Sequence, residues 1–251
     1  MLEVCGIEKS FGKGAGSVRV LDGVSLFADR GEKVGLAGKS GIGKTTLARI
    51  ITGLERPDAG NVLLDGIPLY GCKFSYDRKR GVKIQTVPQH PFASLDPSQK
   101  VGAGVSEALR VHMRVGVKES RDAAVRLLER VWLGSEIYDR YPSQISGGQA
   151  QRVAVAKALA VSPQVLIADE ATAMLDAYQQ AQVIALLNDL AERDGLSVLL
   201  ISHDGKLTEN FADRLYVLEG GKLREASLRN KWNGAESAFG GTTSADGEES
   251  I

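Results

Sequence analysis

The sequence predicts an α/β fold in which strands and helices alternate around a largely parallel sheet. In the last third of the chain, short apolar strand-like runs alternate with helical stretches. Residues 33–37 form a nearly continuous apolar run, which is typical of a central strand buried on both faces, and a glycine-rich loop and a helical run follow it. Residues 101–160 have apolar side chains at helical spacing, which indicates a helical subdomain inserted into the α/β core.

The composition is that of a folded globular protein. The 251 residues include 31 Lys+Arg and 31 Asp+Glu, for a net charge of 0, with 43% hydrophobic and 25% charged residues. Balanced charge argues against bulk electrostatic binding to nucleic acid, so we expect no nucleic-acid partner. The N-terminus has no signal-peptide pattern, and every apolar run is far shorter than the roughly 20 residues that cross a bilayer. We therefore expect a chain that does not itself span a membrane.

The elements follow in order along the chain. Strands are expected in the N-terminal third at residues 2–7, 18–21, 24–28, 33–37 and 61–64, with a helix at 45–52. Strands return at 165–168, 198–201 and 215–218, alternating with helices at 177–192 and 206–212. Residues 233–251 are rich in Gly, Ser, Ala and acidic residues. The prediction is one domain over residues 1–228, with the helical subdomain at about 101–160, and a flexible tail over 229–251.

The two cysteines, Cys5 and Cys72, are too few and too far apart for a disulfide framework or a zinc site. A reducing compartment fits this usage. We expect both side chains to be buried as small hydrophobic residues.

Residues 38–45 match the phosphate-loop pattern Gly-x4-Gly-Lys-[Ser/Thr] between a strand and a helix. Glycines let backbone N–H groups face phosphate oxygens, Lys44 would reach the outer phosphates, and the Thr45 hydroxyl would ligate Mg²⁺. The alternative is a glycine-rich turn with a solvated lysine. The predicted nucleotide-binding residues of this loop are Gly38, Lys39, Ser40, Gly41, Ile42, Gly43, Lys44, Thr45 and Thr46.

A second motif is the apolar strand that ends in Asp169 and Glu170. Ligands of open α/β sheets bind at the carboxyl ends of the strands, so Asp169 could hold Mg²⁺ through water and Glu170 could polarise an attacking water. A buried strand that merely ends in acidic turn residues is the alternative. The phosphate loop favours the functional interpretation.

A third motif, Ser146, Gly147, Gly148 and Gln149, opens a helical run and predicts a second anion-binding helix N-terminus. One chain would then carry two phosphate-binding ends. They need not meet within one molecule.

With these motifs in this order, the sequence resembles the nucleotide-binding subunits of ATP-binding cassette (ABC) transporters over residues 1 to about 225. The resemblance implies a P-loop NTPase core with an N-terminal antiparallel β region. It also implies ATP and Mg²⁺ as cofactors and a head-to-tail dimer. In that dimer, Ser146 to Gln149 of one subunit would cover ATP held by the phosphate loop of the other.

The resemblance assigns roles to four further residues. Phe11 matches the aromatic residue that stacks on adenine, with a core phenylalanine as the alternative. Gln89 matches the glutamine that touches Mg²⁺ and links the site to the transport partner, although it could be a polar turn residue. Asp176 matches the aspartate at the dimer seam. His203 matches the histidine that contacts the γ-phosphate, and a structural histidine is the alternative.

The sequence also departs from the family pattern. Ile145 stands where leucine is usual, and Ala171 follows Glu170 where proline is common. Ala173 and Met174 replace the usual Ser-Ala pair before the seam aspartate. Hydrolysis is still expected, but the contact that the usual serine hydroxyl makes across the dimer is missing.

Residues 91–97, Pro-Phe-Ala-Ser-Leu-Asp-Pro, resemble a segment of the ATPases of peptide and nickel importers, and the short chain favours the nickel and metal-chelate end of that branch. We expect the ATP-hydrolysing subunit of an importer, peripheral on the cytoplasmic face of the cell membrane. The implied partners are transmembrane permease subunits, a second ATPase subunit (identical or paralogous) and, indirectly, a solute-binding protein. Two alternatives remain: a soluble ABC ATPase acting on a protein assembly or nucleic acid, and a nucleotide-binding module without turnover.

Overall fold

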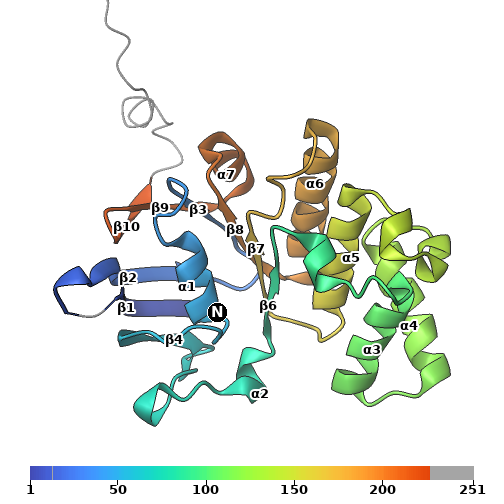
Figure 1. The fold of residues 1–251 in the computed structure, drawn as a ribbon, viewed down its shortest axis with the longest axis horizontal. Coiled ribbons are helices and arrows are strands. Elements are labelled where there is room, and N and C mark those ends of the chain that lie inside the picture. The colour runs from blue at the N-terminus through green and yellow to red at the C-terminus, as the bar shows by residue number, and fades with distance from the viewer. Residues whose placement is uncertain (13, 227–251) are drawn as a thin grey trace, which may run out of the picture.

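The computed structural model describes residues 1–12 and 14–226, and these form two sheets and a group of helices (Figure 1). The predicted tail over 229–251 lies outside the described residues. The strands are β1 (Leu2–Phe11), β2 (Val18–Ala28), β3 (Lys33–Ala37), β4 (Ala59–Leu64), β5 (Ile67–Pro68), β6 (Ile84–Val87), β7 (Val165–Asp169), β8 (Ser197–Ser202), β9 (Arg214–Glu219) and β10 (Lys222–Ala226). The helices are α1 (Lys44–Ile51), α2 (Arg78–Gly81), α3 (Val101–Met113), α4 (Val117–Arg130), α5 (Gly147–Leu159), α6 (Ala177–Asp194) and α7 (Gly205–Phe211).

The smaller sheet is antiparallel and has the strand order β2-β1-β4-β5. Its strand β2 runs through Asp22 and Gly23, where the sequence suggested a break between two strands. Register shifts between β1 and β2, next to Ile7 and Lys9, absorb the extra residues, and Gly23 takes a positive φ of 68°. The two expected runs therefore form one bent strand.

The larger sheet has the order β10-β9-β3-β8-β7-β6, and β9, β3, β8, β7 and β6 pair in parallel. Successive residues of β7 face opposite sides, so Val165 and Ile167 join one hydrophobic cluster while Leu166 and Ala168 join another. The first cluster includes α1 and the antiparallel sheet, and the second includes α5 and α6. Burial on both faces explains why the central strands β3, β7 and β8 are almost continuously apolar, whereas the edge strand β6 contains Gln85 and Thr86.

Helices α3 and α4 pack together beside α5, at the end of the molecule away from the antiparallel sheet (Figure 1). Val105 and Leu109 of α3 meet Ala124 and Leu128 of α4 in the same cluster that covers the core sheet. Because α5 contacts both α3 and β6, it joins the helical group to the sheet. The predicted α/β core with inserted helices is confirmed.

The expected burial of the cysteines is wrong. Cys5 and Cys72 are both free and exposed. Cys5 follows buried Val4 on β1, so the alternation of the strand turns its side chain outward, and Cys72 lies in a 3₁₀ turn at the surface. Among the described residues, no helix combines the length and the apolar character needed to cross a membrane.

Candidate functional site

Several of the predicted site residues follow the carboxyl ends of neighbouring strands. The phosphate loop follows β3, His203 follows β8, Glu170 follows β7 and Gln89 lies two residues beyond β6. These strands are adjacent and parallel, in the order β3-β8-β7-β6, so their carboxyl ends meet at one edge of the sheet. Residues that are far apart in the sequence therefore line one site.

The phosphate loop depends on glycine at its junction with α1. Gly43 is the N-cap of α1 in a left-handed conformation, with φ 116°. A Cβ atom at Gly43 would lie 2.7 Å from Cγ1 of Val20, so both the backbone angle and the space favour glycine. The loop thereby delivers the N-terminus of α1, with its free N–H groups, to the pocket.

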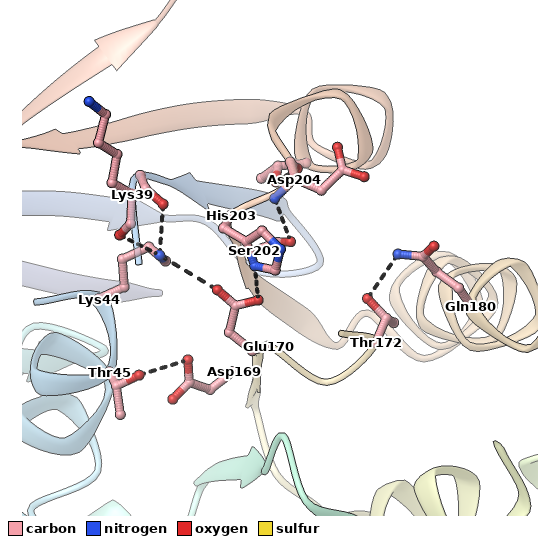
Figure 2. Close-up of polar contacts among 12 residues, drawn as sticks. Lys39, Lys44, Thr45, Asp169, Glu170, Thr172, Gln180, Ser202, His203 and Asp204 are labelled. Atoms are coloured by element: carbon pink, nitrogen blue, oxygen red, sulfur yellow. Dashed lines mark hydrogen bonds and ion pairs between the residues drawn. The ribbon is translucent and has the colours of Figure 1, made fainter. Parts of the chain in front are cut away.

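Lys44 lies buried within the loop, and its Nζ donates to the backbone carbonyls of Gly38 at 2.7 Å and Lys39 at 3.0 Å. Nζ also lies 3.5 Å from Oε1 of Glu170, which extends from the end of β7 (Figure 2). A buried ammonium group beside a carboxylate at the mouth of a phosphate loop is suited to meet phosphate oxygens.

Thr45 and Asp169 form a second pair at this edge. The Thr45 hydroxyl donates to Oδ1 of Asp169 at 3.3 Å (Figure 2). Burial raises the pKa of Asp169, while the Thr45 hydroxyl opposes this rise and the neighbouring Glu170 adds to it. A partly buried carboxylate of this kind gains from a cation placed beside it.

Glu170 is held by groups from two other elements. Its Oε2 lies 2.8 Å from Nδ1 of His203, its Oε1 faces Lys44, and its side chain is only 13% exposed (Figure 2). The backbone of Glu170 has a positive φ of 50°, which is uncommon for a residue with a side chain, and its N–H donates to the carbonyl of Ile201. The end of β7 therefore places this carboxylate over the loop.

A pocket of about 500 Å³ collects most of the predicted residues of the phosphate loop, together with the residues of the strand ends. Its lining comprises Phe11, Val20, Ser40, Gly41, Gly43, Lys44, Thr45, Thr46, Gln89, Glu170 and His203. Phe11 is 43% exposed, so the alternative of a core phenylalanine is wrong. His203 is 57% exposed and reaches Glu170, so it is not a buried structural histidine.

Several predicted residues do not line this pocket. Gly38 and Lys39 contribute through their carbonyls to Lys44, and Ile42 is partly buried against the hydrophobic cluster that includes α1. Asp169 takes part through Thr45. The remaining five, Ser146 to Gln149 and Asp176, are elsewhere.

Ser146 caps α5, with a reciprocal pair of hydrogen bonds to Gln149, and Asp176 caps α6 by accepting from the N–H of Gln179. Gly147 and Gly148 form the first turn of α5, which approaches α6 where a Cβ at Gly148 would lie 3.1 Å from the Gln179 side chain. The second predicted phosphate-binding end is therefore a capped helix N-terminus, separate from the pocket.

Oxygen donors near the loop fit magnesium. The Thr45 hydroxyl, the Asp169 carboxylate and the side-chain oxygen of Gln89 are hard ligands of the kind that Mg²⁺ prefers. Within residues 1–12 and 14–226 there is no cluster of three or more His, Cys, Asp or Glu that could hold a metal alone. This set suits an ion that shares its coordination with phosphate and water.

Two further residues at or beside the site are not among those predicted from the sequence. Val20 of β2 lines the pocket, and Lys9 of β1 lies over the Phe11 ring. The spacing could have revealed Lys9, because residues two apart on a strand share a face. Nothing local marks Val20, since a strand from the other sheet brings it to the site.

Together, the fold and the pocket define a P-loop nucleotide-binding protein. A model described as "ABC transporter" matches residues 21–173, and the chain belongs to the ABC transporter family. The predicted family membership is confirmed.

Curated relatives carry transport names. The chain is 40% identical over 208 residues to the dipeptide transport ATP-binding protein DppF of Haemophilus influenzae, covering 83% of this chain and 64% of that relative. It is 39% identical to DppF of Escherichia coli, covering 85% of this chain and 64% of the relative. It is 36% identical to the di/tripeptide transport ATP-binding protein DppF of Pseudomonas aeruginosa, covering 90% and 70%. The chain thus spans less than two thirds of the length of the first two.

Solved structures agree on the fold. The dimeric ATP-binding cassette MJ0796 bound to ADP and Pi has a TM-score of 0.79 and 32% identity, covering 92% of this chain and all of that one. The CbiO1 protein of Clostridium perfringens, part of an ABC transporter complex, has a TM-score of 0.78 and 27% identity, covering 95% and 90%. These similarities confirm the predicted fold class.

Proposed function

We propose that this chain is the ATP-binding and ATP-hydrolysing subunit of an ABC importer. The observation that supports the proposal best is the Glu170 carboxylate, which lies between Lys44 and His203 over a phosphate loop. Membership of the ABC transporter family and likeness to a cassette bound to ADP and Pi support the same activity.

Residues from the loop and from the strand ends have proposed roles in the reaction. The loop N–H groups and Lys44 bind the β- and γ-phosphates, and Phe11 stacks on the adenine. Glu170 orients a water for in-line attack on the γ-phosphate, and His203 holds that carboxylate through Nδ1 and faces the developing charge. The Thr45 hydroxyl, Gln89 and Asp169 would hold Mg²⁺, which neutralises phosphate charge when bound.

Among the described residues, Ser146 to Gln149 and Asp176 do not line the nucleotide pocket. In the proposed head-to-tail dimer, Ser146 to Gln149 of a second subunit close over the nucleotide, because these residues lie away from their own pocket. Asp176 would lie at the seam between the subunits. Closure by a partner would couple hydrolysis to assembly.

Peptides are the proposed cargo. The curated relatives described above are named for dipeptide or di/tripeptide transport, which favours peptides over nickel or metal chelates for this chain. The proposed partners are transmembrane permease subunits and a second ATPase subunit, with a solute-binding protein acting indirectly. The proposed location is the cytoplasmic face of the cell membrane.

The test is a pull-down with tagged Glu170→Gln protein from detergent-solubilised native cells in ATP and Mg²⁺, followed by mass identification. Glu170→Gln should hold ATP and keep the assembly closed. Recovery of polytopic membrane proteins is the expected result, and tagged Lys44→Ala protein, which should bind ATP weakly, provides the control. Recovery of only soluble proteins or nucleic acid would instead favour an ABC ATPase that acts on a soluble assembly.

A further inference from the structure

Lys9 is a buried cation at the edge of the nucleotide pocket. Its side chain is 11% exposed, and its Nζ lies 2.6 Å from Oε1 of Glu55 and 3.7 Å from Oδ1 of Asp58. Nζ also donates to the backbone carbonyl of Arg56 at 2.7 Å. These partners offset the cost of burying the charge, and they fix the position of the ammonium group.

The segment that holds Lys9 is itself tied to the strand that carries Phe11. The N–H of Asp58 donates to the carbonyl of Glu8 at 2.8 Å, and Oδ2 of Asp58 accepts from the N–H of Ser10 at 2.7 Å. Residues 55–58 follow α1, the helix that begins at the phosphate loop. The end of β1 and the phosphate-loop helix are thus joined through this segment.

The fixed ammonium group of Lys9 lies 5.2 Å from the centre of the Phe11 ring. Lys9 does not line the pocket, whereas Phe11 does and is 43% exposed. The ring therefore lies next to a cation that does not itself line the pocket, while part of the ring remains exposed to meet a ligand. A cation within about 6 Å of a ring face is attracted by the ring quadrupole and restrains the orientation of the ring.

We propose that Lys9 is a positioning residue for the base of the nucleotide, acting through Phe11. The ammonium group holds the ring in place before binding and draws π density of the ring toward itself. Both effects favour stacking, because less order is lost on binding and the repulsion between the two π systems falls. The inference rests on the proposed function, in which Phe11 stacks on adenine.

The test compares Lys9→Met with the parent by titration calorimetry, using ADP and pyrophosphate in Mg²⁺ so that no hydrolysis interferes. We expect Lys9→Met to bind ADP about 3- to 10-fold more weakly, as expected for a lost cation–π contact, and to bind pyrophosphate like the parent. In a Phe11→Leu background, Lys9→Met should change ADP affinity by less than about 2-fold, because the ring through which it acts is gone.

Lys33→Met is the matched control. Lys33 is also largely buried, at 17% exposed, and lies near the carboxylates of Glu192 and Asp213, away from the pocket. The Lys33→Met variant should bind ADP and pyrophosphate like the parent. Lys9→Arg, which keeps the cation, should recover most of the ADP affinity. If Lys9→Met does not fold, Lys9→Gln replaces it in the test, because the glutamine side-chain amide can still donate to the Arg56 carbonyl.

Three results would overturn the inference: unchanged ADP affinity in Lys9→Met, an equal loss for ADP and pyrophosphate, or an undiminished effect in the Phe11→Leu background. Failure of the proposed function looks different. In that case the parent itself binds neither ADP nor pyrophosphate, or Phe11→Leu leaves ADP affinity unchanged.

Discussion

The polar side-chain atoms of Lys44, Glu170 and His203 meet within a few ångströms although the residues come from three separate segments. Lys44 Nζ lies 3.5 Å from one oxygen of Glu170, and His203 Nδ1 lies 2.8 Å from the other. Both oxygens of the carboxylate are thus occupied, which fixes its orientation. A small change at Glu170 is therefore expected to alter chemistry more than structure.

We expect Glu170→Gln to bind ATP as the parent does and to lower the turnover rate by about 10²- to 10⁴-fold, the usual contribution of a residue that manages a proton in the transition state. The amide keeps the shape of the side chain but cannot accept a proton from water. Phosphate release and nucleotide binding measure the two properties. Glu219→Gln, at an exposed position on β9, is the control, and near-parent hydrolysis by Glu170→Gln would show that another residue orients the water.

The raised pKa of Asp169 predicts an unusual dependence of protein stability on pH. Its pKa is raised by burial, so the folded protein binds the proton more tightly than the unfolded chain does. The ionised carboxylate therefore costs stability at neutral pH, and the cost disappears as the pH falls below the unfolded value of about 3.9. In nucleotide-free protein at pH 7, Asp169→Asn should raise the Tm by on the order of 2 °C, with the gain vanishing in acid.

Asp139→Asn provides a control of opposite sign. Lys100 and Arg121 lower the pKa of Asp139, so its carboxylate contributes stability above the unfolded pKa and loses it as the pH falls. Neutralising Asp139 should leave the Tm at pH 7 unchanged or slightly lower. A lower Tm for Asp169→Asn at pH 7 would contradict the argument from burial.

At the scale of elements, α1 depends on anchors at both ends. Gly43 provides the left-handed N-cap, and the Tyr70 and Tyr76 hydroxyls donate to the carbonyls of Ile50 and Ile51 at its C-terminus. Burial raises the pKa of Tyr76 to about 12, so its hydroxyl keeps its proton for this bond. The helix α1, which presents its N-terminus to phosphate, is thus fixed by the antiparallel sheet and by the segment that follows β5.

Gly43→Ala should destabilise the protein by about 1–3 kcal/mol and weaken nucleotide binding. The added Cβ would lie 2.7 Å from Val20, on a backbone with φ 116°. Gly104→Ala is the matched control, because Gly104 lies within α3 and a Cβ there meets nothing within 4 Å. It should stabilise by about 0.5–1 kcal/mol, and chemical denaturation measures both changes. Equal stability of the two variants would show that the loop tolerates a side chain.

At the scale of the whole molecule, residues 146–149 at the start of α5 do not line the pocket, and this separation predicts that two subunits assemble into a dimer. We expect Glu170→Gln protein to dimerise with ATP. Adding Gly147→Asp to this protein should abolish the dimer, because it places a carboxylate where phosphate would meet α5. The monomer should remain stable, because a Cβ at Gly147 makes only ordinary contacts and an acid in the first turn of a helix is favourable.

Analytical ultracentrifugation with and without ATP measures this dimer. Val117→Asp, which places the same carboxylate in the first turn of α4, should leave it intact. If Gly147→Asp still dimerises with ATP, the second phosphate-binding end lies elsewhere.

The sequence by itself determined the phosphate loop, the acidic end of β7, the start of the helix α5 and the alternation of strands and helices. These features are local: glycine conformations, helix caps and apolar periodicity depend on neighbours in the chain. It did not reveal that residues 18–28 form one bent strand, because that depends on the register of β1 against β2.

Only the tertiary structure decided which of these local features share a site. The order β3-β8-β7-β6 brings Lys44, His203, Glu170 and Gln89 to one edge, while the antiparallel sheet adds Phe11, Val20 and the cation of Lys9. The same packing keeps Ser146 and Asp176 away from the pocket, at the starts of α5 and α6. Strand order and sheet packing arise from contacts between distant segments, and a pattern read along the chain does not contain those contacts.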